Sequence, residues 1–224
     1  MDLADLGASQ LVGMIERGEI TSTELVEACL ARIEAKEDAI GAWAHLDPDF
    51  ARRQAAHCDD VHASGAPTGP LHGIPVGIKD IFDTADLPTE NGTVLSKGRL
   101  PDDDSAAVRL LRAAGAVIMG KTVTTELAVY SPGKTRNPHD PERTPGGSSS
   151  GSAAAVAAGM VPLAIGSQTN GSVIRPASFC GVVGFKPTHG RISRAGALAL
   201  SRTLDHVGVF ARTLEDAALI SDCL

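Results

Sequence analysis

The sequence predicts an α/β protein whose β-sheet is covered by helices on both faces. Helical patterns and short apolar runs alternate along the 224 residues, which is typical of this fold class. Apolar runs such as "MVPLAIGS" (160–167) show no polar alternation, as expected for strands that are buried on both faces. Aromatic residues make up only 3% of the chain, so the core must consist mainly of Ala, Val, Leu and Ile.

The N-terminal part of the chain, residues 8–60, has a helical pattern. Thr21 and Glu24 are spaced as a capping box at the start of a helix. The apolar residues that follow, from Leu25 to Ile33, recur on one helical face. This pattern predicts helices that pack on the rest of the protein.

Strands and helices alternate after this segment. We expect strands at 74–82, 116–120, 160–167 and 181–187, and helices at 105–115, 152–159 and 213–224. A polar loop is expected at 131–147. We therefore divide the chain into an N-terminal helical segment, 1–60, that packs on a core formed by 61–224, within a single domain overall.

Composition excludes several classes of function. The net charge is −7 and Lys and Arg form no cluster, so we expect no nucleic-acid partner. No run of 18 apolar residues occurs, so no membrane span is expected. The four cysteines form no C-x-x-C pair, and the seven histidines have no metal-ligand spacing. With no signal peptide pattern at the start, these features predict a cytoplasmic protein without cofactor or metal.

Two short motifs suggest other activities but fail in their context. "GAVIMGKT" (115–122) matches the phosphate-binding Walker A pattern, yet its middle residues are predicted to form a strand. "GSSSG" (147–151) matches the nucleophile elbow of serine hydrolases, with Ser149 as nucleophile. An elbow needs a strand directly before the serine, whereas a polar loop precedes this one.

Three other features carry groups suited to catalysis. Lys79 ends an apolar strand, where burial would lower its pKa and make it a base, unless it pairs with Asp80 or reaches solvent. The Gly-Ser loop at 146–151 offers hydroxyls and free N–H groups before a helix, although it is equally suited to capping that helix. The polar turn at 167–172 follows a strand and can line an oxyanion hole.

Together these stretches resemble the amidase signature hydrolases along nearly the whole chain. "GIPVGIKD" resembles the strand that carries the family lysine, which would be Lys79. "PGGSSSGSAAAVAAG" resembles the signature loop, and its first serine, Ser148, falls where the family has a cis-peptide serine. "GSQTNGSVIRPA" resembles the nucleophile segment and makes Ser172 the nucleophile. The resemblance implies a mixed sheet, a Ser–cis-Ser–Lys triad and hydrolysis of a carboxylic amide through an acyl-enzyme.

The resemblance also implies an oxyanion hole. Its donors would be the main-chain N–H groups of Thr169, Asn170, Gly171 and Ser172. Asn170 stands where the family frequently has Gly, and Asn tolerates a positive φ better than most residues.

Two other positions differ from related sequences. Ser150 stands where the family often has Gly. Gln168 stands where tRNA-dependent amidotransferase subunits of the family usually have Asp. We therefore expect a free-standing amidase that acts on a small-molecule amide, and keep the amidotransferase A-type subunit as a less favoured alternative.

The largest difference between this chain and the family is its length. Family members are about twice as long, and their C-terminal half completes the sheet and much of the acyl pocket. The chain therefore resembles a truncated N-terminal half, and a non-catalytic or incomplete fragment that needs a C-terminal half or a partner is an alternative. The sequence leaves the substrate open and allows a homo-oligomer.

Overall fold

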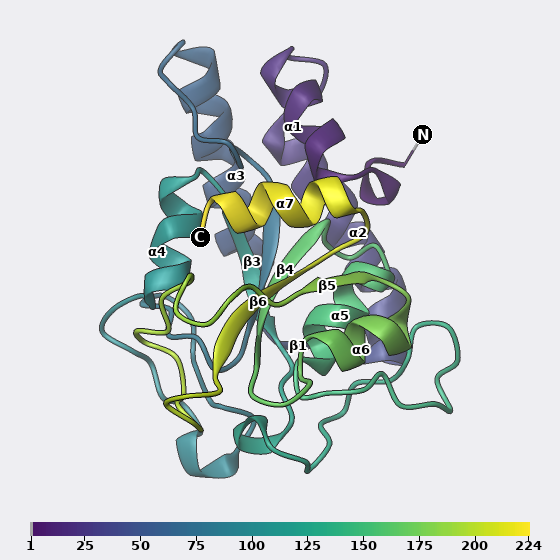
Figure 1. Cartoon of the computed structure of the whole chain (residues 1–224). Helices are drawn as coiled ribbons and strands as arrows, with labels where there is room; N and C mark the ends of the chain where they lie inside the picture. Colours follow the sequence, from purple (N-terminus) through teal and green to yellow (C-terminus); the bar gives the residue numbers. More distant parts are fainter. Residues whose placement is uncertain (1) are drawn as a thin grey trace.

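The computed structural model describes residues 2–224 and contains a mixed six-stranded sheet flanked by helices (Figure 1). The strands are β1 (Trp43–Leu46), β2 (Pro75–Lys79), β3 (Val117–Thr122), β4 (Leu163–Gln168), β5 (Val183–Phe185) and β6 (His206–Ala211). Their order in the sheet is β1-β3-β2-β4-β6-β5. Strand β2 pairs in parallel with β3 and β4, whereas the β1–β3, β4–β6 and β5–β6 pairs are antiparallel. The predicted α/β class with a mixed sheet is confirmed.

Helices cover the sheet. They are α1 (Ala8–Glu16), α2 (Ser22–Ile40), α3 (Pro48–Ala63), α4 (Ala106–Ala113), α5 (Ser150–Ala157), α6 (Ile174–Cys180) and α7 (Leu214–Asp222), with single 3₁₀ turns at Leu3–Asp5, Val94–Ser96 and Glu126–Ala128. Every residue of β2 and β3 is buried, and successive strand residues face opposite sides, so both faces of the sheet are covered. None of the helices in residues 2–224 is long and apolar enough to cross a lipid bilayer.

The N-terminal segment is helical with one exception. Thr21 and Glu24 form the predicted capping box at the start of α2, and Gly41 ends this helix in a left-handed conformation, with φ +65°. The chain then forms β1, which pairs antiparallel with β3, so the helical prediction for 8–60 was wrong at Trp43–Leu46. The division at residue 60 stays a prediction.

The parallel strands bring three polar residues to one edge of the sheet. Lys79, Thr122 and Gln168 are the last residues of β2, β3 and β4, whose carboxyl ends point the same way. Helix α5 packs against these strands and lies beside α6 (Figure 1). The hydroxyl of Ser152 in α5 donates to the carbonyl of Ile165 at 2.9 Å and so ties the helix to β4. Ligands of α/β proteins bind at this edge of the sheet.

Lys121, the lysine of the Walker-like motif, is buried within β3, which extends two residues beyond the strand predicted at 116–120. Its ammonium donates to the carbonyls of Phe82 and Pro88 at 2.9 and 3.1 Å and to the hydroxyl of Thr89 at 2.5 Å. The carboxylate of Asp80 lies 3.5 Å away. The side chain therefore holds the segment after β2 against the sheet, and its donors are occupied by the protein itself.

We predict that Lys121→Ala destabilises the protein by about 3–5 kcal/mol, because it removes the positive charge beside the buried Asp80 carboxylate and a donor to the carbonyls of Phe82 and Pro88. The free energy of unfolding in urea measures this effect. Lys97→Ala, at an exposed lysine, is the matched control and should change the free energy little. Equal effects of the two substitutions would show that Lys121 does not anchor this segment.

Candidate active site

Lys79 lies at the centre of the site and is fully buried. Its Nζ is 2.8 Å from the hydroxyl oxygen of Ser148 and 2.9 Å from that of Ser167. Burial lowers the pKa of Lys79 to about 7, although the negative charge of Asp205 acts in the opposite direction. The alternative pairing of Lys79 with Asp80 does not occur, because Asp80 lies beside Lys121. Lys79 therefore has a pKa suited to proton transfer near neutral pH.

The Gly-Ser loop brings Ser148 to Lys79. The peptide bond between Gly147 and Ser148 is cis, and the side chain of Ser148 is buried. The carbonyl of Ser148 accepts a hydrogen bond from the main-chain N–H of Thr125 at 3.0 Å, which fixes the loop against the segment that follows β3. Ser148 thus has the cis geometry and the lysine neighbour that the sequence predicts for it.

The other two serines of the triplet contact the main chain instead. The hydroxyl of Ser149 donates to the carbonyl of Ser167 at 3.2 Å and accepts from its N–H at 3.3 Å. The hydroxyl of Ser150 points to the carbonyl of Val123 at 3.5 Å. No strand precedes the triplet directly, so the strand-turn-helix context of a nucleophile elbow at Ser149 is missing.

The predicted nucleophile, Ser172, lies in a tight turn between β4 and α6. The side-chain oxygen of Gln168 closes this turn by accepting from the N–H groups of Val173 and Ile174, both at 3.0 Å. Gly171 has φ +155°, and an added Cβ would lie 2.6 Å from the guanidinium of Arg175. Because other residues rarely adopt this φ, glycine is favoured at 171, whereas the flexible Arg175 side chain could move aside.

Asn170 does not adopt the positive φ that the sequence analysis considered for this position. Its side-chain amide instead donates to the hydroxyl of Tyr130 at 3.0 Å. This contact links the turn to the segment that follows β3.

The N–H groups of the predicted oxyanion hole are free of partners within residues 2–224. Thr169, Asn170, Gly171 and Ser172 lie outside β4 and α6, and none of their main-chain N–H groups donates to an acceptor of the described chain. Consecutive N–H groups of this kind can stabilise a developing oxyanion. Their role in the reaction stays a prediction.

The loop that carries Ser148 packs against the segment that carries Ser172. At one end it is held by the hydroxyl contacts to Ser167 described above. At the other end, an added Cβ on Gly146 would lie 2.9 Å from the Cα of Pro176 in α6. No hydrogen bond joins Ser148 to Ser172 within residues 2–224. The contact that a proton transfer between these two serines needs is therefore not formed in this structure.

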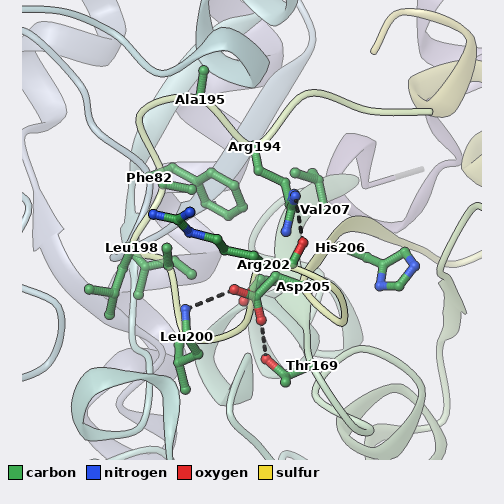
Figure 2. A pocket seen from close by; sticks show the side chains of 14 residues that line it. Phe82, Thr169, Arg194, Ala195, Leu198, Leu200, Arg202, Asp205, His206 and Val207 are labelled. Atoms are coloured by element: carbon green, nitrogen blue, oxygen red, sulfur yellow. Dashed lines mark hydrogen bonds between the residues drawn. The ribbon is translucent and has the colours of Figure 1, made fainter. Parts of the chain in front are cut away.

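The contacts of two residues of the site were not predicted. Ser167 is the second partner of Lys79. Asp205 accepts from the hydroxyl of Thr169 at 2.5 Å and from the N–H of Leu200 at 2.8 Å (Figure 2). It also accepts from the N–H of Ser201 at 2.8 Å. The contacts of Ser167 with Lys79 and of Asp205 with Thr169 have no local sequence signal, because these partners lie 88 and 36 residues away.

The chain belongs to the amidase family. The sequence profile described as Amidase matches residues 24–224, which is most of the chain. The buried lysine, the cis-peptide serine and the mixed sheet agree with this assignment.

Comparison with individual relatives shows what share of their length this chain covers. The A-type subunit of glutamyl-tRNA(Gln) amidotransferase from Salinispora arenicola is 45% identical over 229 residues, which cover 100% of this chain and 47% of that protein. The native peptide amidase from Stenotrophomonas maltophilia has a TM-score of 0.94 at 39% identity, over 99% of this chain and 48% of that one. Fatty acid amide hydrolase has a TM-score of 0.92 at 30% identity, over 98% and 40%. The chain thus spans about half the length of the curated relatives it matches.

We predict that burial of neutral Lys79 makes stability depend on pH. The folded-state pKa is about 7, whereas the unfolded chain holds this proton up to about pH 10.4. The unfolded state therefore binds more protons between these values, and the contribution of Lys79 to stability rises with pH there. The difference in unfolding free energy between wild type and Lys79→Met should rise by up to about 1.4 kcal/mol per pH unit in this window.

Urea titrations between pH 6 and 10 measure this difference. The exposed Lys97 supplies the control, since Lys97→Met should give a difference that stays flat with pH. A flat difference for Lys79→Met as well would mean that Lys79 is protonated in the folded state throughout.

Proposed function

We propose that this chain carries the catalytic Lys–Ser–Ser group of an amidase that hydrolyses a carboxylic amide to an acid and an amine or ammonia. In this mechanism Lys79 is the base, Ser148 is the relay and Ser172 is the nucleophile. The observation that carries the proposal is the 2.8 Å contact between the fully buried Nζ of Lys79 and the hydroxyl of Ser148. A lysine whose pKa is about 7 has a large neutral fraction at physiological pH and can accept a proton.

The first half of the reaction moves one proton along the three residues. Neutral Lys79 takes the hydroxyl proton of Ser148 while Ser148 takes that of Ser172, and the oxygen of Ser172 attacks the amide carbonyl carbon. The carbonyl electrons move to the oxygen, where the free N–H groups of the turn at 169–172 stabilise the negative charge. The hydrogen bond between Ser148 and Ser172 forms in the substrate complex, since catalytic contacts often tighten only there.

The second half restores the enzyme. The oxyanion collapses, the C–N bond breaks, and the relay returns its proton to the leaving nitrogen. Water, deprotonated by the same relay, then attacks the acyl-enzyme ester. The ester C–O bond breaks, the relay returns the proton to the oxygen of Ser172, and the acid is released. Ser167 holds the Lys79 amine in place throughout through its hydroxyl.

We predict that a fluorophosphonate labels Ser172 of the chain and that the rate rises with pH around the Lys79 pKa of about 7. Ser172→Ala should remove the label, because the nucleophilic oxygen is gone. Lys79→Ala should slow labelling about 100-fold or more, because the general base is lost. Mass spectrometry of the modified peptide identifies the labelled serine.

Ser149→Ala is the matched control, since Ser149 is a buried serine of the same loop that contacts only main-chain groups. It should leave Ser172 labelled. A label on Ser149 in the wild type would overturn the assignment of the nucleophile. Absence of any label would contradict catalysis by this chain and favour an incomplete fragment that needs its C-terminal half or a partner.

A second candidate function is the A-type subunit of a tRNA-dependent amidotransferase. The relative from Salinispora arenicola described above carries that name, as does one from Chloroflexus aurantiacus at 44% identity. The side-chain oxygen of Gln168 accepts two main-chain hydrogen bonds here, and a carboxylate oxygen is also an acceptor, so the residue type at 168 does not by itself argue against this function.

We predict that affinity-tagged chain expressed in its native cells purifies without stoichiometric partner subunits if it is a free-standing amidase. Mass spectrometry of the purified material tests this. The matched control is a tagged A-type amidotransferase subunit, which should bring its partners through the same procedure. Stoichiometric recovery of those partners with this chain would instead establish the amidotransferase role.

A further inference from the structure

Asp205 faces the first residue of the turn at 169–172 because of the register of the sheet. Strands β4 and β6 pair antiparallel, and Gln168 lies opposite His206 at their ends. One step further along each chain, Asp205 therefore lies opposite Thr169. The hydroxyl of Thr169 donates to the carboxylate of Asp205 at 2.5 Å, and Figure 2 shows this contact at the wall of a cavity of about 310 Å³.

The other oxygen of this carboxylate binds a second segment. It accepts hydrogen bonds from the main-chain N–H groups of Leu200 and Ser201, both at 2.8 Å. Asp205 is buried, and hydrogen bonds to an ionised carboxylate are about twice as strong as those between neutral groups. The carboxylate thus joins the turn at 169–172 to the segment that precedes β6.

The segment before β6 has further attachments of its own. The N–H of Leu198 donates to the carbonyl of Ile81, which follows β2, at 2.9 Å. The guanidinium of Arg194 donates to the carbonyl of Ser201 at 3.2 Å. Thr169 is therefore tied to a support that is held independently of the turn.

The charge of Asp205 also acts on the base of the site. Its negative charge opposes the effect of burial on the pKa of Lys79, which lies at about 7. The neighbouring elements β3, β4 and α5 contain one charged residue, Lys121, and it lies beside Asp80. Among the described residues that line the cavity, Asp205 alone is acidic. The other charged or titratable residues of this lining are Arg194, Arg202 and His206.

We propose that Asp205 is a positioning residue of this site: its carboxylate fixes Thr169, and with it the N–H groups of the turn, and its negative charge acts on the Lys79 amine. It is not a catalytic residue, because none of its hydrogen bonds within residues 2–224 goes to Lys79, Ser148 or Ser172. The inference rests on the proposed function, in which the turn stabilises the oxyanion. Fixing the first residue of the turn orients the N–H groups that follow it, and a small displacement of such groups slows catalysis strongly.

Two variants separate the position of the turn from the charge of Asp205. Asp205→Asn keeps the size of the side chain and removes its charge, whereas Thr169→Val removes the hydroxyl donor and leaves the charge in place. Each should slow fluorophosphonate labelling of Ser172 at high pH by about 10- to 100-fold, as expected for a weakened hydrogen bond to a charged group and a displaced turn. Only Asp205→Asn should also lower the pH midpoint of labelling, because without this negative charge the pKa of Lys79 falls further.

The double variant measures whether the two residues act together. In the Asp205→Asn background, Thr169→Val should slow labelling less than it does in the wild type, because the contact that it removes is already weakened. Asp103→Asn is the matched control, since Asp103 is an exposed aspartate that does not line the cavity, and it should change neither the rate nor the midpoint. Labelling at the wild-type rate in either single variant, or independent effects in the double variant, would overturn the inference.

An NMR titration of the lysine side chains in the full chain tests the charge without any reaction. Lys79 should titrate at a lower pH in Asp205→Asn than in the wild type, and the main-chain signals of residues 169–172 should shift in both Asp205→Asn and Thr169→Val. An unchanged titration of Lys79 in Asp205→Asn, or unchanged signals of the turn in both variants, would overturn the inference. Absence of labelling in the wild type would contradict the proposed function, and these NMR signals would still decide the role of Asp205, so the two failures are distinguishable.

Discussion

The burial of the Lys79 amine is the constraint on which the site depends. A charged ammonium in a closed interior without a carboxylate is unfavourable, so the pKa falls and the neutral amine is stabilised. The amine still needs hydrogen-bond partners, and it obtains them from hydroxyls on two separate segments, the loop before α5 and the end of β4. The inner position of β2, between β3 and β4, brings both segments to it.

A second buried lysine, on the neighbouring strand, shows how a different environment changes the pKa and the role of a lysine. Lys121 lies opposite Ile78 in the sheet, but it contacts main-chain carbonyls and lies near the carboxylate of Asp80. Burial lowers its pKa only to about 8, because Asp80 acts in the opposite direction. Two buried lysines on adjacent strands thus serve different purposes, since one retains a neutral amine and the other holds the segment that includes Phe82.

Long, strongly patterned elements and long motifs could be predicted from the sequence. The capping box of α2, most of strand β3 and the cis-peptide Ser148 were all found in this way. Strand β1 was missed because four residues between two helices carry little pattern, and α6 and β6 were not assigned. The contacts of Ser167 with Lys79 and of Asp205 with Thr169 could not be predicted, because they depend on how distant segments meet.

The close packing around Gly166 limits the changes in chain length that the protein can tolerate. An added Cβ at this position would lie 2.6 Å from the hydroxyl of Ser149 and 2.7 Å from the ring of Phe210. Inserting or deleting one residue within β4 would exchange the two faces of the strand and bring a larger side chain into this space. Natural variation in length should therefore concentrate in surface loops such as 131–147 and be absent from the six residues of β4.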